Sequence, residues 1–267
     1  MLVKRFLQGI LILFFVVLFI VDLVLVTFRF QILNKDFWIT SLEEGAVYEI
    51  LEQEFTNYIE DTFVDNNEII SEGRELAKVF DKESIQIFLE RNIELVFAYI
   101  NNEAPEIVVY IPIEEFPSDI KQRLEINSEE ISLDYLIRTY GKGSTPIGKE
   151  AFDNLRTINR NIIVPLIVIT ILLIVDLIML YILETKDHRH FGMWAALIAS
   201  GISTFIMIIF VSELSRNAFG GDFDGDIGGK LVLSIVPSLT NQIIRFWTIV
   251  GASTVATSFV FLALKKR

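Results

Sequence analysis

Four long runs of apolar residues dominate this chain, and each is long enough to cross a lipid bilayer. They cover residues 6–28, 162–183, 193–214 and 243–264. A hydrocarbon core about 30 Å thick is crossed by about 20 helical residues. Backbone N–H and C=O groups in lipid must bond to one another, and a helix achieves this within one segment. The sequence therefore predicts an all-α membrane protein with four transmembrane helices.

The polar segment between the first two runs, residues 29–160, carries most of the charge. It holds 27 acidic and 13 basic residues, a net charge of −14, whereas the whole chain has −12. We expect it to form a separate acidic domain, inserted between a first span in residues 1–28 and three spans in residues 161–267. Its acidity argues against nucleic acid as a partner. The absence of cysteine excludes disulfides, thiolate metal sites and thiol catalysis, and leaves the redox compartment undetermined.

The basic residues near the four runs predict the orientation in the membrane. They lie before the first run, between the second and third, and after the fourth: Lys4, Arg5, Lys186, Arg189 and residues 265–267. Short segments rich in Lys and Arg stay in the cytoplasm. We therefore expect a multi-pass protein of the plasma membrane with both termini cytoplasmic and residues 29–160 extracytoplasmic. The first run exceeds a cleavable signal sequence and no cleavage site follows it, which predicts an uncleaved signal anchor.

Within residues 29–160 the spacing of apolar residues is mainly helical. Residues 47–63 and 85–100 have apolar stripes with the period of a helix, and Asp81 is placed to cap the second. Residues 106–113, with prolines at both ends, favour an edge strand or half of a small hairpin. Further helices are expected over residues 69–80, 117–126, 128–140 and 148–160, the last as a stalk into the second span. The domain should therefore be mainly helical with one small β element.

Small residues distinguish the third and fourth runs from the bulky first two. The third contains Ala195, Ala199 and Ser203 four apart, with Ala196 and Ser200 beside them, and the fourth contains the small residues of 251–258. Small residues at this spacing let two helix backbones approach closely in lipid. We expect the third and fourth spans to touch along these faces and to form the packed centre of the bundle.

Two acidic residues interrupt the runs, Asp22 in the first and Asp176 in the second, each within an Ile-Val-Asp-Leu tetrapeptide. A carboxylate at such a depth costs at least about 2.5–3.5 kcal/mol, so it should face the interior of the bundle. One hypothesis is an ion or proton path. The other is structural: each accepts hydrogen bonds from Ser or Thr of the third and fourth spans, and Asp22 meets Arg245. A separation of about 12 Å in height argues against a carboxylate pair.

A glycine-rich turn before the fourth run carries Asp222, Asp224 and Asp226 at alternate positions. Carboxylates on a flexible backbone are suitable ligands for calcium, and the alternative is a solvated polar turn. His188 and His190, the only histidines, favour a solvated basic turn. The chain has no phosphate-binding loop and no zinc-protease or serine-hydrolase motif. We expect no enzymatic activity, and no cofactor other than this candidate calcium ion.

The order of spans and polar domain is similar to that of permeases of the cell-division and lipoprotein-release ABC transporter class. Those permeases couple to their ATPase through a cytoplasmic helix between the second and third spans, where this chain has only residues 184–192. Residues 37–48 and 135–141 also resemble segments of uncharacterised prokaryotic four-span envelope proteins, a resemblance that implies no activity.

Two classes of function fit these patterns. The first is a non-enzymatic protein of the cell envelope whose external domain binds another protein or a second copy, while its spans anchor it in the lipid bilayer. The second is a transport component, either an ABC-type permease subunit or a bundle that conducts ions through Asp22 and Asp176.

Overall fold

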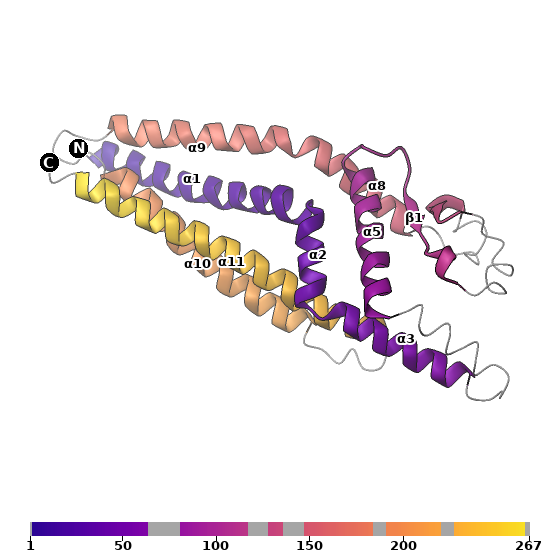
Figure 1. Ribbon diagram of the computed structural model, residues 1–267. Helices are drawn as coiled ribbons and strands as arrows, with labels where there is room; N and C mark the ends of the chain where they lie inside the picture. The colour runs from indigo at the N-terminus through magenta and orange to yellow at the C-terminus, as the bar shows by residue number, and fades with distance from the viewer. Residues whose placement is uncertain are drawn as a thin grey trace. The chain divides into compact units, whose positions relative to one another are not determined.

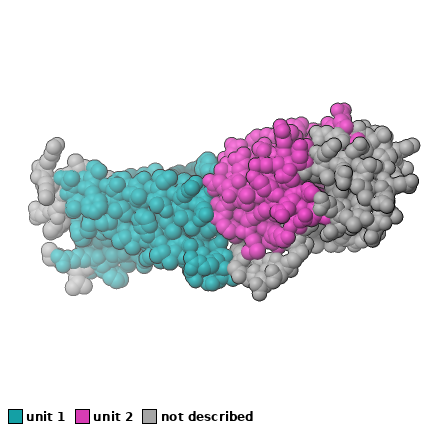
Figure 2. Space-filling view, turned by 60° about the horizontal axis from the view of Figure 1, so that its bottom comes forward, with its two compact units in different colours: residues 1–32, 161–221, 239–267 teal, residues 33–160, 222–238 magenta. Residues whose placement is uncertain are grey.

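The computed structural model describes residues 2–63, 81–116, 128–135, 147–183, 191–219 and 227–264. The chain divides into two compact units, which Figure 2 shows in different colours. The membrane unit comprises Met1–Ile32, Asn161–Gly221 and Leu239–Arg267. The polar unit comprises Leu33–Arg160 and Asp222–Ser238.

Four helices are long and apolar enough to cross a membrane: α1 (Leu2–Thr27), α9 (Ile163–Leu183), α10 (Phe191–Phe219) and α11 (Ile227–Leu264). The predicted four spans are thus confirmed as candidate membrane helices. The π-helix η1 (Phe28–Ile32) extends α1. The fourth helix begins well before the predicted residue 243, because the polar turns of its first part belong to the polar unit.

Helix α1 is the centre of the membrane unit. It packs against α9 and α10 along its length and runs between them in Figure 1. Phe15 of α1 forms a buried cluster with Leu173 and Leu180 of α9 and Ala196 of α10. Trp247 joins α11 to α1, because its indole N–H donates to Thr27 Oγ1 at 2.7 Å. Among the described residues, α1 thus contacts each of the other three spans, a contact set that the expected centre of third and fourth spans did not include.

Helices α10 and α11 approach closely where glycines face each other. A Cβ added at Gly201 would clash with the Val255 side chain and would lie 3.1 Å from the Gly251 carbonyl oxygen. The predicted contact of small residues is confirmed here. The fully buried row of α10 is Ala196, Ser200 and Thr204, one residue beyond the predicted row of Ala195, Ala199 and Ser203.

Three helices build the core of the polar unit: α2 (Lys35–Glu44), α3 (Val47–Phe63) and α5 (Lys82–Ile100). Asp81 caps α5 as predicted, since its Oδ1 accepts from the Ser84 backbone N–H at 2.8 Å. Helices α2, α3 and α5 bury Leu42, Val47, Tyr48 and Ile85, and Leu231 and Ile235 of α11 pack against these residues.

A two-stranded antiparallel sheet lies beside α5 and consists of β1 (Val108–Tyr110) and β2 (Glu130–Ser132), with Val109 opposite Ile131. Strand β1 confirms the strand expected within residues 106–113. The 3-10 helix η2 (Ile113–Glu115) follows it. The sheet also corrects the helix expected over residues 128–140, whose first part is strand. Non-local pairing outweighs the helical spacing of these residues. The expected helices over residues 69–80 and 117–126 lie outside the described residues.

The stalk predicted over residues 148–160 is helix α8 (Ile147–Asn161), which a turn at Ile162 separates from α9. Its buried Asn159 donates through Nδ2 to the Ile100 carbonyl at 3.1 Å and to Asn101 Oδ1 at 3.0 Å. These bonds attach α8 to the C-terminal end of α5. They also satisfy the carbonyl of Ile100, which is among the last carbonyls of α5 and has no partner within that helix.

Candidate functional site

Asp22, the acid of the first span, contacts the second span. Its Oδ1 lies 3.0 Å from Thr170 Oγ1 of α9, and that hydroxyl is also 2.9 Å from the Leu166 carbonyl. The hydroxyl partner foreseen for this acid thus comes from α9 rather than from the third or fourth span. Arg245 precedes Trp247 by two residues, and Trp247 bonds to Thr27, five residues after Asp22, so the backbone of Arg245 is about 10 Å along the helix axis from Asp22. The structure does not bring the two together.

Asp176, the acid of the second span, is enclosed. Only 3% of it is exposed, and its Oδ2 has no hydrogen-bond partner. It lies on α9 one turn from Leu173 and one turn from Leu180, on the face that packs against α1 and α10. Thr170, the residue of α9 that contacts Asp22, lies six residues before Asp176, which is about 9 Å along the axis of α9. The two acids therefore do not form a carboxylate pair.

The candidate calcium residues Asp222, Asp224 and Asp226 lie outside the described residues, as do His188 and His190. Within the described ranges, no group of three or more His, Asp or Glu side chains is placed to hold a metal ion. The calcium hypothesis therefore stays a prediction from sequence.

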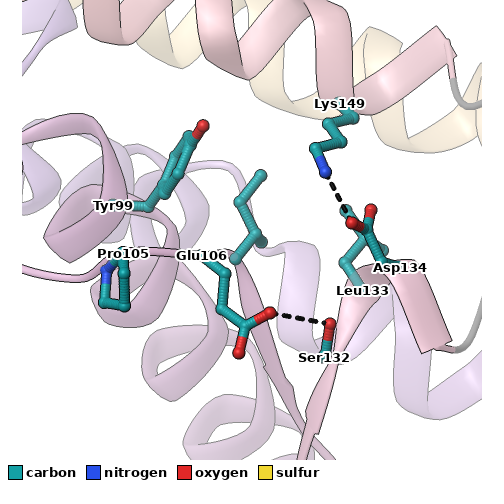
Figure 3. Close-up of a pocket in the computed structure, with 8 residues that line it drawn as sticks. Tyr99, Pro105, Glu106, Ser132, Leu133, Asp134 and Lys149 are labelled. Carbon is teal, nitrogen blue, oxygen red and sulfur yellow. Dashed lines mark hydrogen bonds and ion pairs between the residues drawn. The ribbon is translucent and has the colours of Figure 1, made fainter.

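A cavity of about 80 Å³ opens between the end of α5, the sheet and α8 (Figure 3). It is lined by Tyr99, Pro105, Glu106, Ile107, Ser132, Leu133, Asp134 and Lys149. Binding sites for free metabolites usually enclose about 300–1,000 Å³. This cavity holds about two or three water molecules, since each occupies about 30 Å³. It therefore has room for a small group, such as the end of a side chain.

The polar groups of the cavity belong to separate contacts at its rim. Lys149 Nζ lies 2.6 Å from Asp134 Oδ2, and this contact raises the pKa of the lysine. Ser132 Oγ donates to Glu106 Oε2 at 3.1 Å, and the Tyr99 hydroxyl donates to Asp153. Glu106 is an exposed carboxylate at this rim. The rim can therefore accept a hydrogen-bond donor or a positive charge.

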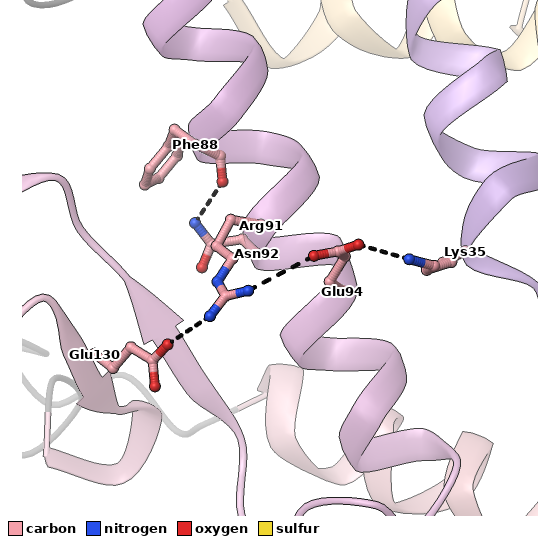
Figure 4. A network of polar contacts seen from close by, with 6 residues as sticks. All are labelled: Lys35, Phe88, Arg91, Asn92, Glu94 and Glu130. Atoms are coloured by element: carbon pink, nitrogen blue, oxygen red, sulfur yellow. Dashed lines mark hydrogen bonds and ion pairs between the residues drawn. The ribbon is translucent and has the colours of Figure 1, made fainter.

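A chain of charges connects α5 to its neighbours (Figure 4). Lys35 Nζ contacts Glu94 Oε1 at 2.6 Å, Glu94 Oε2 is 3.8 Å from Arg91, and Arg91 Nη2 is 3.0 Å from Glu130 Oε1. The hydrogen bond from Lys35 lowers the pKa of Glu94. This chain joins α2, α5 and β2. Its side chains are 42–49% exposed, so each pair contributes modestly to stability.

Sequence reasoning missed both the cavity and this chain of charges. Their residues come from segments far apart in the chain and are individually ordinary Lys, Glu and Tyr residues. The one local signal was the pair of prolines at either end of residues 106–113, because these prolines predicted where the strand beside the cavity begins and ends.

No family model, no curated protein and no solved structure matches the chain.

Proposed function

We propose that this protein is a non-enzymatic integral membrane protein of the cell envelope whose polar unit binds another protein or a second copy of the chain. The observation that carries the proposal is the size of the cavity between α5, the sheet and α8. A volume of about 80 Å³ suits the end of a partner's side chain and is too small for a free metabolite. A polar, partly solvated rim is also typical of surfaces that bind proteins.

The proposal places the polar unit outside the plasma membrane, between spans 1 and 2, with both termini in the cytoplasm. The support is the distribution of Lys and Arg at the ends of the spans. The spans anchor the protein in the bilayer, and the uncleaved first span acts as the signal anchor. In this arrangement the partner is extracytoplasmic or lies in the same membrane.

A photo-crosslinking amino acid tests this function in native membranes. Placed at the exposed rim residue Pro105, it should give one defined crosslinked product, which mass spectrometry identifies. Ile87, exposed on α5 and about 18 Å along that helix from Tyr99, is the matched control and should give none. Two differently tagged copies in one cell show whether the product is a homodimer. Equal products from both positions, or none from Pro105, would contradict the proposal.

A transport component is the second candidate, either an ABC-type permease subunit or an ion-conducting bundle. The enclosed Asp176 favours it, because an ionisable residue buried among membrane helices usually has a functional role. Purification from native membranes separates the candidates. A stoichiometric ATPase in the purified complex supports a permease subunit, whereas an envelope protein or a homo-oligomer supports the first proposal.

A further inference from the structure

The cavity between the end of α5, the sheet and α8 has an excess negative charge. The described residues that line it include two carboxylates, Glu106 and Asp134, and one ammonium group, that of Lys149. Lys149 Nζ lies 2.6 Å from Asp134 Oδ2, so these two charges neutralise each other (Figure 3). Glu106 Oε2 accepts a hydrogen bond from the neutral Ser132 hydroxyl at 3.1 Å. Within the described residues this carboxylate forms no ion pair, so its charge remains without a counter-charge there.

Much of the remaining lining is apolar. Pro105, Ile107 and Leu133 belong to it, as does Tyr99, whose hydroxyl donates to Asp153. A long side chain with an apolar stem and a charged end fits such a lining. Its methylene groups pack against apolar walls, while its charge stays at a polar rim. The excess carboxylate at the rim requires that this charge be positive.

The volume of the cavity distinguishes between the cationic side chains. About 80 Å³ is the space of two or three water molecules. The end of a lysine side chain, an ammonium group on a chain of methylenes, fits this space, whereas the guanidinium of arginine is a broader planar fork. Because Glu106 Oε2 already accepts from Ser132, one bond from an ammonium group forms more easily than the two parallel bonds that a guanidinium prefers.

The charge of the polar segment around the cavity also favours a basic ligand. Residues 29–160 have a net charge of −14. A negative field of this kind attracts basic partners and disfavours acidic ones. The one ammonium group of the lining offers little to an acidic partner, because Lys149 is already paired with Asp134.

We propose that this cavity binds the side chain of a lysine on the partner protein. The proposal rests on the protein-binding function proposed above and specifies the chemistry of the partner. The lysine ammonium donates to Glu106 at the rim, and the methylene stem packs beside Ile107 and Leu133. The partner is therefore a protein that presents a basic segment to the polar unit.

Binding of a small lysine probe to the purified full-length protein in detergent tests the site without the partner. The probe is Nα-acetyl-lysine methylamide, and ligand-observed NMR measures its dissociation constant. Glu106→Gln keeps the size of the side chain and removes its charge, so it should weaken binding by about two- to fivefold. Glu83→Gln is the matched control, since it removes the same charge about 24 Å along α5 from Tyr99 and should leave binding unchanged. Lys149→Gln leaves Asp134 without its cation and should strengthen binding.

The corresponding arginine and glutamate derivatives test the choice of ligand. The lysine derivative should bind most tightly of the three. Tighter binding of the arginine derivative would overturn the choice of lysine. Binding of the glutamate derivative that is lost in Lys149→Gln would assign the cavity to an acidic partner and overturn the proposal. Equal or absent binding of the lysine probe in wild type and Glu106→Gln would also overturn it.

Crosslinking from Pro105 in native membranes separates a failure of this site from a failure of the protein-binding function. Glu106→Gln should reduce the yield of the crosslinked product, whereas Glu83→Gln should not. A product whose yield is unchanged in Glu106→Gln would overturn the lysine site and leave the protein-binding function standing. If Pro105 gives no product while the lysine probe still binds through Glu106, the protein-binding function is contradicted and the preference of the cavity for lysine stands.

Discussion

Trp247 illustrates how single hydrogen bonds connect the membrane helices. Its indole N–H donates to Thr27 Oγ1, and the Thr27 hydroxyl donates in turn to the Leu23 carbonyl at 2.7 Å. Both residues are buried. In a bundle without a hydrophobic drive between helices, such a bond fixes the rotation of α11 against α1.

We expect Trp247→Phe to lower the free energy of unfolding by about 0.5–2 kcal/mol, because it keeps an aromatic ring and removes the donor. Trp194→Phe is the matched control, since Trp194 Nε1 is buried without a partner and its loss should be neutral or stabilising. Denaturant unfolding in mixed micelles measures both. A larger loss at Trp194 would contradict the assignment.

Asn92 has the corresponding role in the polar unit. Its Oδ1 accepts from the Tyr110 N–H at 2.9 Å, and its Nδ2 donates to the Tyr110 carbonyl at 3.0 Å. Asn92→Ala should lower the melting temperature, since it removes both side-chain hydrogen bonds to the backbone of Tyr110 in β1, at a cost of about 1–3 kcal/mol. The amide of Tyr110 should also exchange its hydrogen faster. Gln86→Ala removes only a contact within α5 to Glu90 and should change stability by less than about 0.5 kcal/mol.

At the scale of helices, the contact between α10 and α11 depends on the absence of a side chain at Gly201. Gly201→Ala should destabilise the protein by about 1–3 kcal/mol, because the new methyl group meets Val255 and the Gly251 carbonyl. Gly9→Ala in α1 is the matched control. Nothing lies within 4 Å of its added Cβ, so the better helix propensity of alanine should make it neutral or stabilising. Melting temperatures in detergent decide between these outcomes.

The link between α2 and α5 through Lys35 and Glu94 should depend on pH. Lys35 lowers the pKa of Glu94 below its ordinary value of 4.5, so the contact stabilises the fold above that pH. Its contribution, about 0.2–1 kcal/mol for so exposed a pair, is lost as the pH falls through the lowered pKa. A double-mutant cycle with Lys35→Met and Glu94→Gln should show this coupling at pH 7 and not in acid. Coupling that persists in acid would contradict it.

The elements that sequence reasoning predicted best are those specified by local signals. The stripe of residues 47–63 and the cap at Asp81 are contained within one helix each, and both are present. Strand β2 was missed because its pairing depends on β1, about 20 residues earlier. The early start of α11 was missed because Lys230 and Ser234 look too polar for a span. Their partners are Glu54 and the Gly45 carbonyl of the polar unit, which local hydropathy does not reveal.

At the scale of the whole molecule, the lack of cysteine makes single-cysteine variants clean probes of orientation. Glu103→Cys, at an exposed position of the polar unit, should react with a membrane-impermeant maleimide in intact cells. Val3→Cys, at a position that is 79% exposed, should react only after permeabilisation. This expectation follows from the proposed topology, in which the basic residues near the ends of the spans keep both termini in the cytoplasm. The reverse labelling pattern would overturn the proposed topology.

The packing of Leu231 and Ile235 against Leu42, Val47 and Tyr48 has a consequence for biosynthesis. Ser234 and Gly45, which are bonded to each other, are separated by 189 residues. At translation rates of about 5–20 residues per second, the first part of α11 is synthesised roughly 10–40 s after α2 and α3. Until then, this part of α11 cannot cover the apolar core that α2 and α3 contribute to. During this time the nascent polar unit exposes apolar surface on its own side of the membrane. A truncated product that lacks α11 should therefore remain a substrate for chaperones and proteases.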